Sequence, residues 1–147
     1  MTAALLDVNV LVALFDPLHI NHEDAHVWFA SHGRRRWATC AITVNGCIRV
    51  LSSPDYPSLT ATPLQVVQRL RILCARPNHE FWPEDVSLLD EERFHWERIT
   101  GYRQITDVYL LSLAVARDAQ LVTFDRSIPW QAVAGAKASG LRILGAG

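Results

Sequence analysis

The sequence lacks the features that mark several common protein classes. Its 147 residues include only three cysteines, Cys40, Cys47 and Cys74, and none lies in a CxxC or Cys/His pair with metal-site spacing. This odd number predicts buried free thiols in a reducing compartment. No uninterrupted apolar run approaches membrane-spanning length, and the first residues carry no basic leader. We therefore expect a cytoplasmic protein with no membrane partner.

Glycine-rich phosphate loops are also absent. Neither GxGxxG nor GxxxxGKS follows the first predicted strand, which argues against the usual dinucleotide and nucleoside triphosphate sites. No GxSxG motif is present, which argues against the usual serine hydrolase triad. Chemistry based on these motifs is therefore excluded.

Lysine is almost missing, whereas arginine is not. Lys137 is the only lysine among 14 basic residues, and the formal net charge is −1. Arginine suits bidentate phosphate contacts, but an arginine-rich genome explains the bias equally well. With 50% hydrophobic residues, the chain can bury one sizeable core, so we expect a single domain over residues 1–147.

Short strand-like segments alternate with longer helical segments. The predicted strands cover residues 3–6, 37–40, 79–82, 121–125 and 141–144. Helices are predicted over residues 8–15 and 90–99, and a short helical segment over residues 130–134. Another runs from an Asn21 cap to Gly33, one contains Val44, one begins at Pro63, and one is capped by Thr106. This alternation predicts an α/β fold, in which a mostly parallel sheet of four or five strands carries helices on both faces.

Three aspartates are expected at one edge of this sheet. Asp7 and Asp125 end strands, and Asp107 starts a helix. Ligands of such sheets bind beyond the carboxyl ends of the strands, where three carboxylates would repel one another unless a cation lay between them. Oxygen ligands favour Mg²⁺ or Mn²⁺. Taken singly, Asp107 could be a first-turn residue stabilised by the helix dipole, and Asp125 could be a residue that forms a turn. Asp7 is different, because it has apolar neighbours and a carboxylate there is costly to bury without a partner.

The segment HEDAH, residues 22–26, matches the H-E-x-x-H motif of zinc proteases, and His32 stands where a third ligand would be expected. The chain has Phe29 where those proteases need a glycine to turn back. If the helix continues, the six residues from His26 to His32 rotate it by roughly 600°, which points the two side chains apart. We therefore predict a polar helix face that carries histidines.

Several segments together resemble PIN-domain ribonucleases. They are LLDVNVLVAL at the start, TDVYLLSLAV after two thirds of the chain and LVTFDR near the end. The resemblance extends to essentially the whole chain and is closest to the VapC toxins of bacterial toxin–antitoxin pairs. It implies a three-layer αβα PIN-like fold. It also implies that Asp7, Asp107 and Asp125 are catalytic and are three of the four acidic residues that hold Mg²⁺ or Mn²⁺.

The fourth acidic position departs from the family pattern. ATCAITVNGCIRVLSSPDYP resembles the second-helix motif of one VapC group, which usually reads T-E-N-G with an arginine three residues later. Thr43, Asn45, Gly46 and Arg49 fit this motif, but Val44 replaces the glutamate. An isopropyl group cannot bind a cation, so weakened or absent activity is expected. Two accounts stay open: an inactivated toxin, or a naturally degenerate PIN domain that acts by binding RNA or an antitoxin.

The resemblance further implies hydrolysis of RNA phosphodiester bonds, a VapB-like antitoxin and a homodimer. Arg49 and the arginine cluster at residues 34–36 would contact the RNA backbone. A solvated loop is the other interpretation of residues 34–36. Asn9 is expected at the substrate site, where it would orient the ligands of the metal; helix capping or packing is the other interpretation of this residue. Four aromatic residues look suited to partner surfaces: Trp28, Phe29, Trp82 and Trp96.

Overall fold

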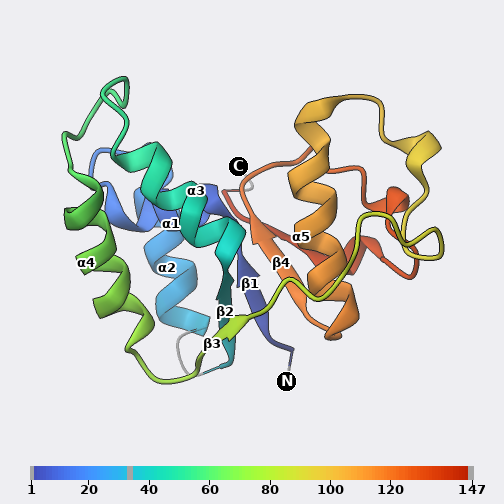
Figure 1. Cartoon of the computed structure of the whole chain (residues 1–147). Helices are drawn as coiled ribbons and strands as arrows, with labels where there is room; N and C mark the ends of the chain where they lie inside the picture. Colours follow the sequence, from blue (N-terminus) through green and yellow to red (C-terminus); the bar gives the residue numbers. More distant parts are fainter. Residues whose placement is uncertain (1, 33–34, 146–147) are drawn as a thin grey trace.

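The computed structural model describes residues 2–32 and 35–145 and contains a five-stranded sheet. The spatial order is β3-β2-β1-β4-β5, and every neighbouring pair is parallel. The strands are β1 (Ala4–Leu6), β2 (Trp37–Cys40), β3 (His79–Trp82), β4 (Gln120–Thr123) and β5 (Leu141–Ile143). The predicted α/β fold is confirmed, and the carboxyl ends of all five strands lie along one edge (Figure 1).

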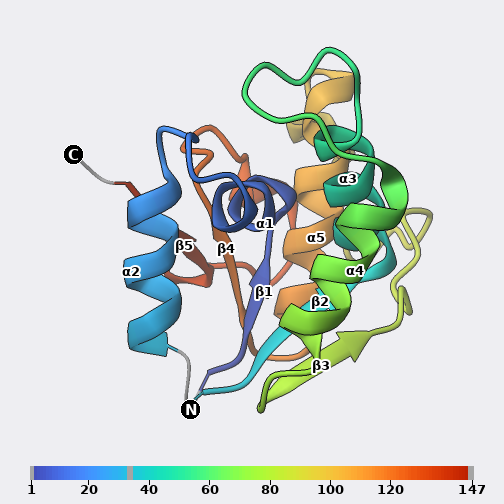
Figure 2. The ribbon, with the colours of Figure 1, turned by 90° about the vertical axis from the view of Figure 1, so that its left-hand side faces the viewer.

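Helices cover both faces of the sheet and make three layers (Figures 1 and 2). The helices are α1 (Val8–Phe15), α2 (His22–His32), α3 (Ala41–Leu51), α4 (Pro63–Cys74) and α5 (Ile105–Ala116). Ala4 and Leu6 of β1 belong to the core cluster shared with α1 to α4, whereas Leu5 belongs to the cluster shared with α5. This alternation follows from the two-residue period of a strand, and it explains why β1 is apolar on both faces.

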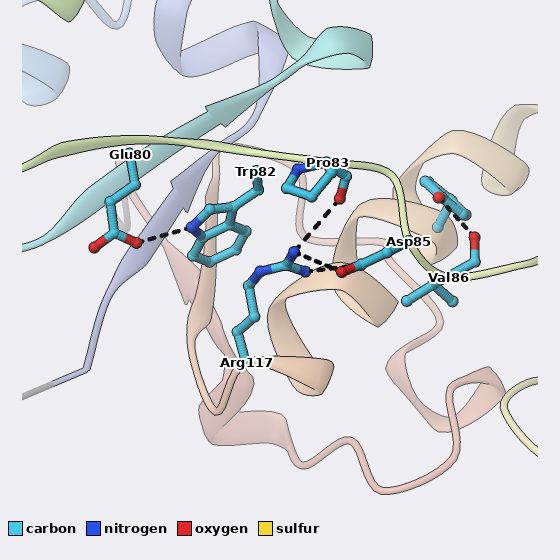
Figure 3. A network of polar contacts seen from close by, with 7 residues as sticks. Glu80, Trp82, Pro83, Asp85, Val86 and Arg117 are labelled. Atoms are coloured by element: carbon cyan, nitrogen blue, oxygen red, sulfur yellow. Dashed lines mark hydrogen bonds and ion pairs between the residues drawn. The ribbon is translucent and has the colours of Figure 1, made fainter.

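A network of polar contacts holds the carboxyl end of α5 against the segment after β3 (Figure 3). The Arg117 guanidinium donates to both carboxylate oxygens of Asp85, over 3.2 and 3.0 Å, and lies 4.9 Å from the centre of the Trp82 ring. The Tyr109 hydroxyl donates to the carbonyl oxygen of Val86 over 2.7 Å. These contacts fix the position of α5, and Asp107 lies in its first turn.

The predicted helix over residues 90–99 is wrong. The segment forms turns and one 3₁₀ helix, Trp96–Arg98. Phe94 instead makes an antiparallel bridge with Val133, and the His95 amide donates to the Ala132 carbonyl over 2.8 Å. Backbone pairing with a distant segment has therefore overridden a local helical pattern.

Other boundaries also differ from the prediction. Thr106 is not a cap, because α5 begins at Ile105 after the 3₁₀ helix Tyr102–Gln104. The segment after Pro129 forms only one 3₁₀ turn, Trp130–Ala132. The fourth strand ends at Thr123, so Asp125 lies two residues beyond it. The predicted stop at Gly33 lies outside the described residues.

Burial differs from expectation at several apolar residues. Helical spacing predicts one apolar face of α4 made of Leu64, Val67, Leu70 and Leu73. The buried residues are instead Val66, Leu70 and Leu73, and Leu64 is 61% exposed. Trp28, Phe29 and Trp82 are largely buried in the core, whereas Trp96 is 41% exposed. Among the helices that the structure describes, none is long and apolar enough to cross a membrane.

Candidate active site

Asp7 links β1 to α1 at the carboxyl edge of the sheet. Its amide donates to the Val122 carbonyl over 2.9 Å, which extends the β1–β4 pairing by one step. Its Oδ1 accepts a hydrogen bond from the Val8 amide over 2.7 Å and so caps the helix. The side chain is only 5% exposed. A strand that ends where a helix begins therefore places one buried carboxylate at this edge.

Thr123, the last residue of β4, connects three parts of the site. Its buried hydroxyl donates to Asp7 Oδ2 over 2.8 Å. The hydroxyl oxygen of Thr123, Oγ1, in turn accepts hydrogen bonds from Asn9 Nδ2 over 3.2 Å and from the Asp125 amide over 3.0 Å. Thr123 thus fixes one Asp7 oxygen and the backbone of Asp125 at once. Thr123 was not among the predicted site residues, although its place two positions before Asp125 is a signal in the sequence.

Asn9 and Asp125 complete this side of the site. Asn9 Oδ1 accepts a hydrogen bond from the Phe124 amide over 3.2 Å, so its side chain ties the first turn of α1 to the end of β4. Asp125 Oδ1 accepts from the amide and the hydroxyl of Ser127, over 2.8 and 2.7 Å. Among the described residues, no side chain or backbone amide donates a hydrogen bond to its other oxygen, Oδ2.

Asp107 faces these carboxylates from the other side of the sheet edge. Burial first, and then the charges of Asp7 and Asp125 together with a hydrogen bond to Asp125, raise the pKa of Asp107 to about 7. The pKa of Asp7 is also raised, mainly by burial, although its hydrogen bonds from Thr123 and Val8 act in the opposite direction. Asp7 and Asp125 therefore lie close enough to Asp107 to raise its pKa, and Asp125 lies close enough to Asp7 to act in the same direction.

The same three side chains do not form a finished coordination sphere. Across residues 2–32 and 35–145, no group of three or more His, Cys, Asp or Glu side chains is placed to hold a metal ion. The donor set is nevertheless all oxygen and partly desolvated, which fits a hard divalent cation.

Helix α3 starts at the same edge, directly after β2. Its first turn is fixed by Thr43, whose hydroxyl accepts from the Cys40 amide over 3.0 Å, and by Glu84, whose carboxylate accepts from the Ile42 amide over 3.2 Å. A Cβ at Gly46 would lie 2.5 Å from Val8 Cγ2, so α3 passes very close to the residue after Asp7. Val44 is half-buried and packs against the core cluster of α1.

The predicted arginines lie in different places. Arg49 is exposed on α3 and lines a hollow of about 500 Å³ with Gly46 and Tyr56. No hydrogen bond or ion pair among the described residues joins it to the carboxylates. Arg35 and Arg36 precede β2 and therefore lie at the amino edge, opposite the aspartates. Arg35 and Arg36 are therefore not neighbours of the three aspartates, and Arg34 lies outside the described residues.

The HEDAH segment is structural. His22 Nδ1 lies 2.7 Å from the Ala13 carbonyl oxygen, and His26 Nε2 lies 2.9 Å from that of Leu14, at the end of α1. His32 is buried and stacks on Trp28, with 4.8 Å between ring centres. The histidines therefore satisfy backbone carbonyls and pack against the core, in agreement with the rejection of a zinc protease site.

Comparisons with known proteins identify the family of this chain and agree with its fold. Residues 4–135 match the PIN domain family. Ribonuclease VapC44 of Mycobacterium tuberculosis is 46% identical over 144 residues, which span 96% of this chain and 99% of that protein. The crystal structure of M. tuberculosis VapC20, a sarcin-ricin loop cleaving toxin, superposes with a TM-score of 0.63 at 13% identity, over 90% of this chain and 98% of that one. VapBC2 from Rickettsia felis, bound to a DNA fragment from its promoter, gives a TM-score of 0.58 at 16% identity, over 97% of both chains.

Proposed function

Because this chain belongs to the PIN-domain family and is a close relative of the VapC ribonucleases, we propose that it is an endoribonuclease toxin that depends on Mg²⁺ or Mn²⁺. The reaction is hydrolysis, in which water adds across one P–O ester bond of RNA and leaves one phosphate end and one hydroxyl end. The observation that carries this proposal is the hydrogen-bonded link from Asp7 through Thr123 to the Asp125 backbone at the carboxyl edge of the sheet, with Asp107 in the first turn of α5.

The roles of the residues follow from their contacts. Asp7, Asp107 and Asp125 would hold the metal ion, which when bound lowers the pKa of a water molecule and offsets charge on the leaving oxygen. Thr123 keeps one Asp7 oxygen oriented, and Asn9 holds the end of β4 in register with α1. Arg49, exposed beside α3, would contact a phosphate of the RNA backbone.

Val44 limits the activity of this sequence. A valine supplies no ligand and no charge, so the three remaining carboxylates should bind metal more weakly than four would. Its half-buried position tolerates an apolar side chain, and the fold is therefore maintained. This observation also favours a second candidate function, in which the protein binds RNA or an antitoxin without cleaving RNA.

Partners follow from the same family membership. We expect a VapB-like antitoxin to neutralise the protein, and we expect the protein to form a homodimer. Leu64 and Ile72 of α4 are 61% and 74% exposed, which supplies apolar surface for such contacts. Neutralisation would involve blocking the acidic edge, where a cationic side chain could replace the metal ion.

RNA cleavage by matched variants tests the proposal. The natural chain, Val44→Glu and Val44→Glu/Asp7→Asn are compared at equal concentration with Mg²⁺ or Mn²⁺, and then with EDTA. We expect weak or no cleavage by the first, clear cleavage by the second that EDTA abolishes, and none by the third. If the first two are equally inert with metal present, the binding function is the correct one.

A further inference from the structure

Arg35 and Arg142 lie on a hollow at the amino edge of the sheet, where the proposed cleavage site does not use them. The hollow has a volume of about 600 Å³. It is lined by Thr2, Trp28, Ser31, His32, Arg35, Gln120 and Arg142. None of the described residues that line it is acidic. Two guanidinium groups with hydroxyl and amide neighbours make this an anion-binding surface.

The two arginines reach the hollow from segments far apart in sequence. Arg35 follows α2, whereas Arg142 lies in the middle of β5. Arg142 pairs in register with Val122, a member of the core cluster of α1 to α4. Since register partners in a sheet point to the same face, Arg142 faces the layer that contains α2 (Figure 2).

The charges of both arginines are available to a ligand. Among the described residues, neither Arg35 nor Arg142 forms an ion pair, whereas the adjacent Arg36 pairs with Glu80. An adjoining hollow of about 440 Å³ shares Trp28, Ser31 and Arg142, but there Asp24 contributes a carboxylate. A phosphate would be repelled at that end, so the Arg35 end of the surface is the anion site.

We propose that this hollow binds backbone phosphates of the RNA substrate at a distance from the cleavage site. This inference rests on the proposed function, because it extends the path of the RNA beyond the three aspartates. Arg35 lies five residues before Cys40, the last residue of β2. At the rise of an extended strand, this separates Arg35 from the carboxyl edge of the sheet by about 17 Å. Only an RNA longer than a few nucleotides, or a folded one, can therefore reach both edges.

RNA binding in EDTA, where cleavage is prevented, tests the proposal by fluorescence anisotropy. The probes are labelled RNAs of about 4 and about 16 nucleotides, the range that one small domain contacts. The variants are Arg35→Gln/Arg142→Gln and, as a control with the same loss of charge, Arg69→Gln/Arg71→Gln on α4. We expect the first pair to weaken binding of the long RNA about tenfold and to lower its salt slope by about 1.4, while the α4 control leaves both unchanged. The short RNA cannot reach both edges and should bind weakly to every variant.

A second measurement reports on the hollow itself. Trp28 lines the hollow, so titration with inorganic phosphate should shift its indole N–H resonance in the natural chain and in the α4 control, but not in Arg35→Gln/Arg142→Gln. Equal loss of RNA binding in both double variants, or an unchanged affinity for the long RNA, would overturn the inference. A natural chain that neither binds nor cleaves RNA would instead refute the proposed function.

Discussion

The Thr123 hydroxyl donates a hydrogen bond to Asp7 Oδ2 over 2.8 Å, although the two residues are 116 positions apart in sequence. This contact joins the ends of two neighbouring parallel strands, β1 and β4, at the edge where Asp125 also lies. The orientation of the most buried carboxylate of the site therefore depends on a neutral side chain from another strand.

Removal of this hydroxyl should damage both stability and metal binding. Thr123→Val retains the shape of the side chain but leaves Asp7 Oδ2 without its buried donor, and we expect a loss of about 1–3 kcal/mol in the free energy of unfolding. Because the lost bond lowered the pKa of Asp7, that pKa should rise further. Urea denaturation and Mn²⁺ titration calorimetry measure the two effects. Thr123→Ser, which retains the hydroxyl, should lie much closer to the natural chain; equal behaviour of the two variants would show that the bond is unimportant.

The metal-free protein should lose stability as the pH rises from about 4 to about 7. The pKa of Asp107 is raised from 3.8 to about 7 in the folded state, so over this window the folded chain retains a proton that the unfolded chain releases. Burial raises the pKa of Asp7 and contributes with the same sign. Urea denaturation in EDTA at several pH values measures this slope.

Asp107→Asn provides the control for this pH dependence. It removes the titrating group and should leave a shallower slope together with higher stability at pH 8. A metal-free chain whose stability is constant from pH 4 to pH 7 would contradict the proximity of the three carboxylates.

Val44→Glu should change the effect of metal on stability. Without metal, a fourth carboxylate adds repulsion and should lower the melting temperature. With Mn²⁺ at about 100 times the dissociation constant, binding linkage should stabilise the variant by about 2.7 kcal/mol. In Val44→Gln the new side chain is similar in size to glutamate but carries no charge. This variant should show neither the lower melting temperature without metal nor the stabilisation by Mn²⁺. If glutamine and glutamate respond alike to Mn²⁺ in a thermal melt, residue 44 does not face the metal site.

Gly46→Ala should destabilise the protein even though alanine is the better helix former. The intrinsic gain is about 1 kcal/mol at most. The new Cβ, however, would lie 2.5 Å from Val8 Cγ2, and valine has little rotamer freedom to move away. We expect a net loss of about 1–3 kcal/mol in urea denaturation, as for other overpacked sites. The double variant Val8→Ala/Gly46→Ala should recover part of this loss, and a failure to do so would locate the strain elsewhere.

Much of the fold could be predicted because local patterns and burial agree. The limits of β2 and β3 match the predicted ranges, and α1 begins and ends where it was expected. The helix predicted for residues 90–99 is wrong because backbone pairing with residues 132–134 replaces it. That pairing joins segments about 40 residues apart, so the local sequence pattern does not reveal it. The buried face of α4 begins at Val66, two residues after the predicted Leu64, because α4 packs against α3 with Val66 on the buried side.

The sequence by itself determined that three aspartates meet at one edge, because parallel strands joined by helices present their carboxyl ends on the same side. It also determined the family, through motifs whose order does not depend on contacts. Only the tertiary structure decided that Thr123 orients Asp7 and that Arg35 lies at the opposite edge beside Arg142. These relationships depend on strand order and register, which follow from how two apolar layers bury their surface together and cannot be inferred from the spacing of residues along the chain.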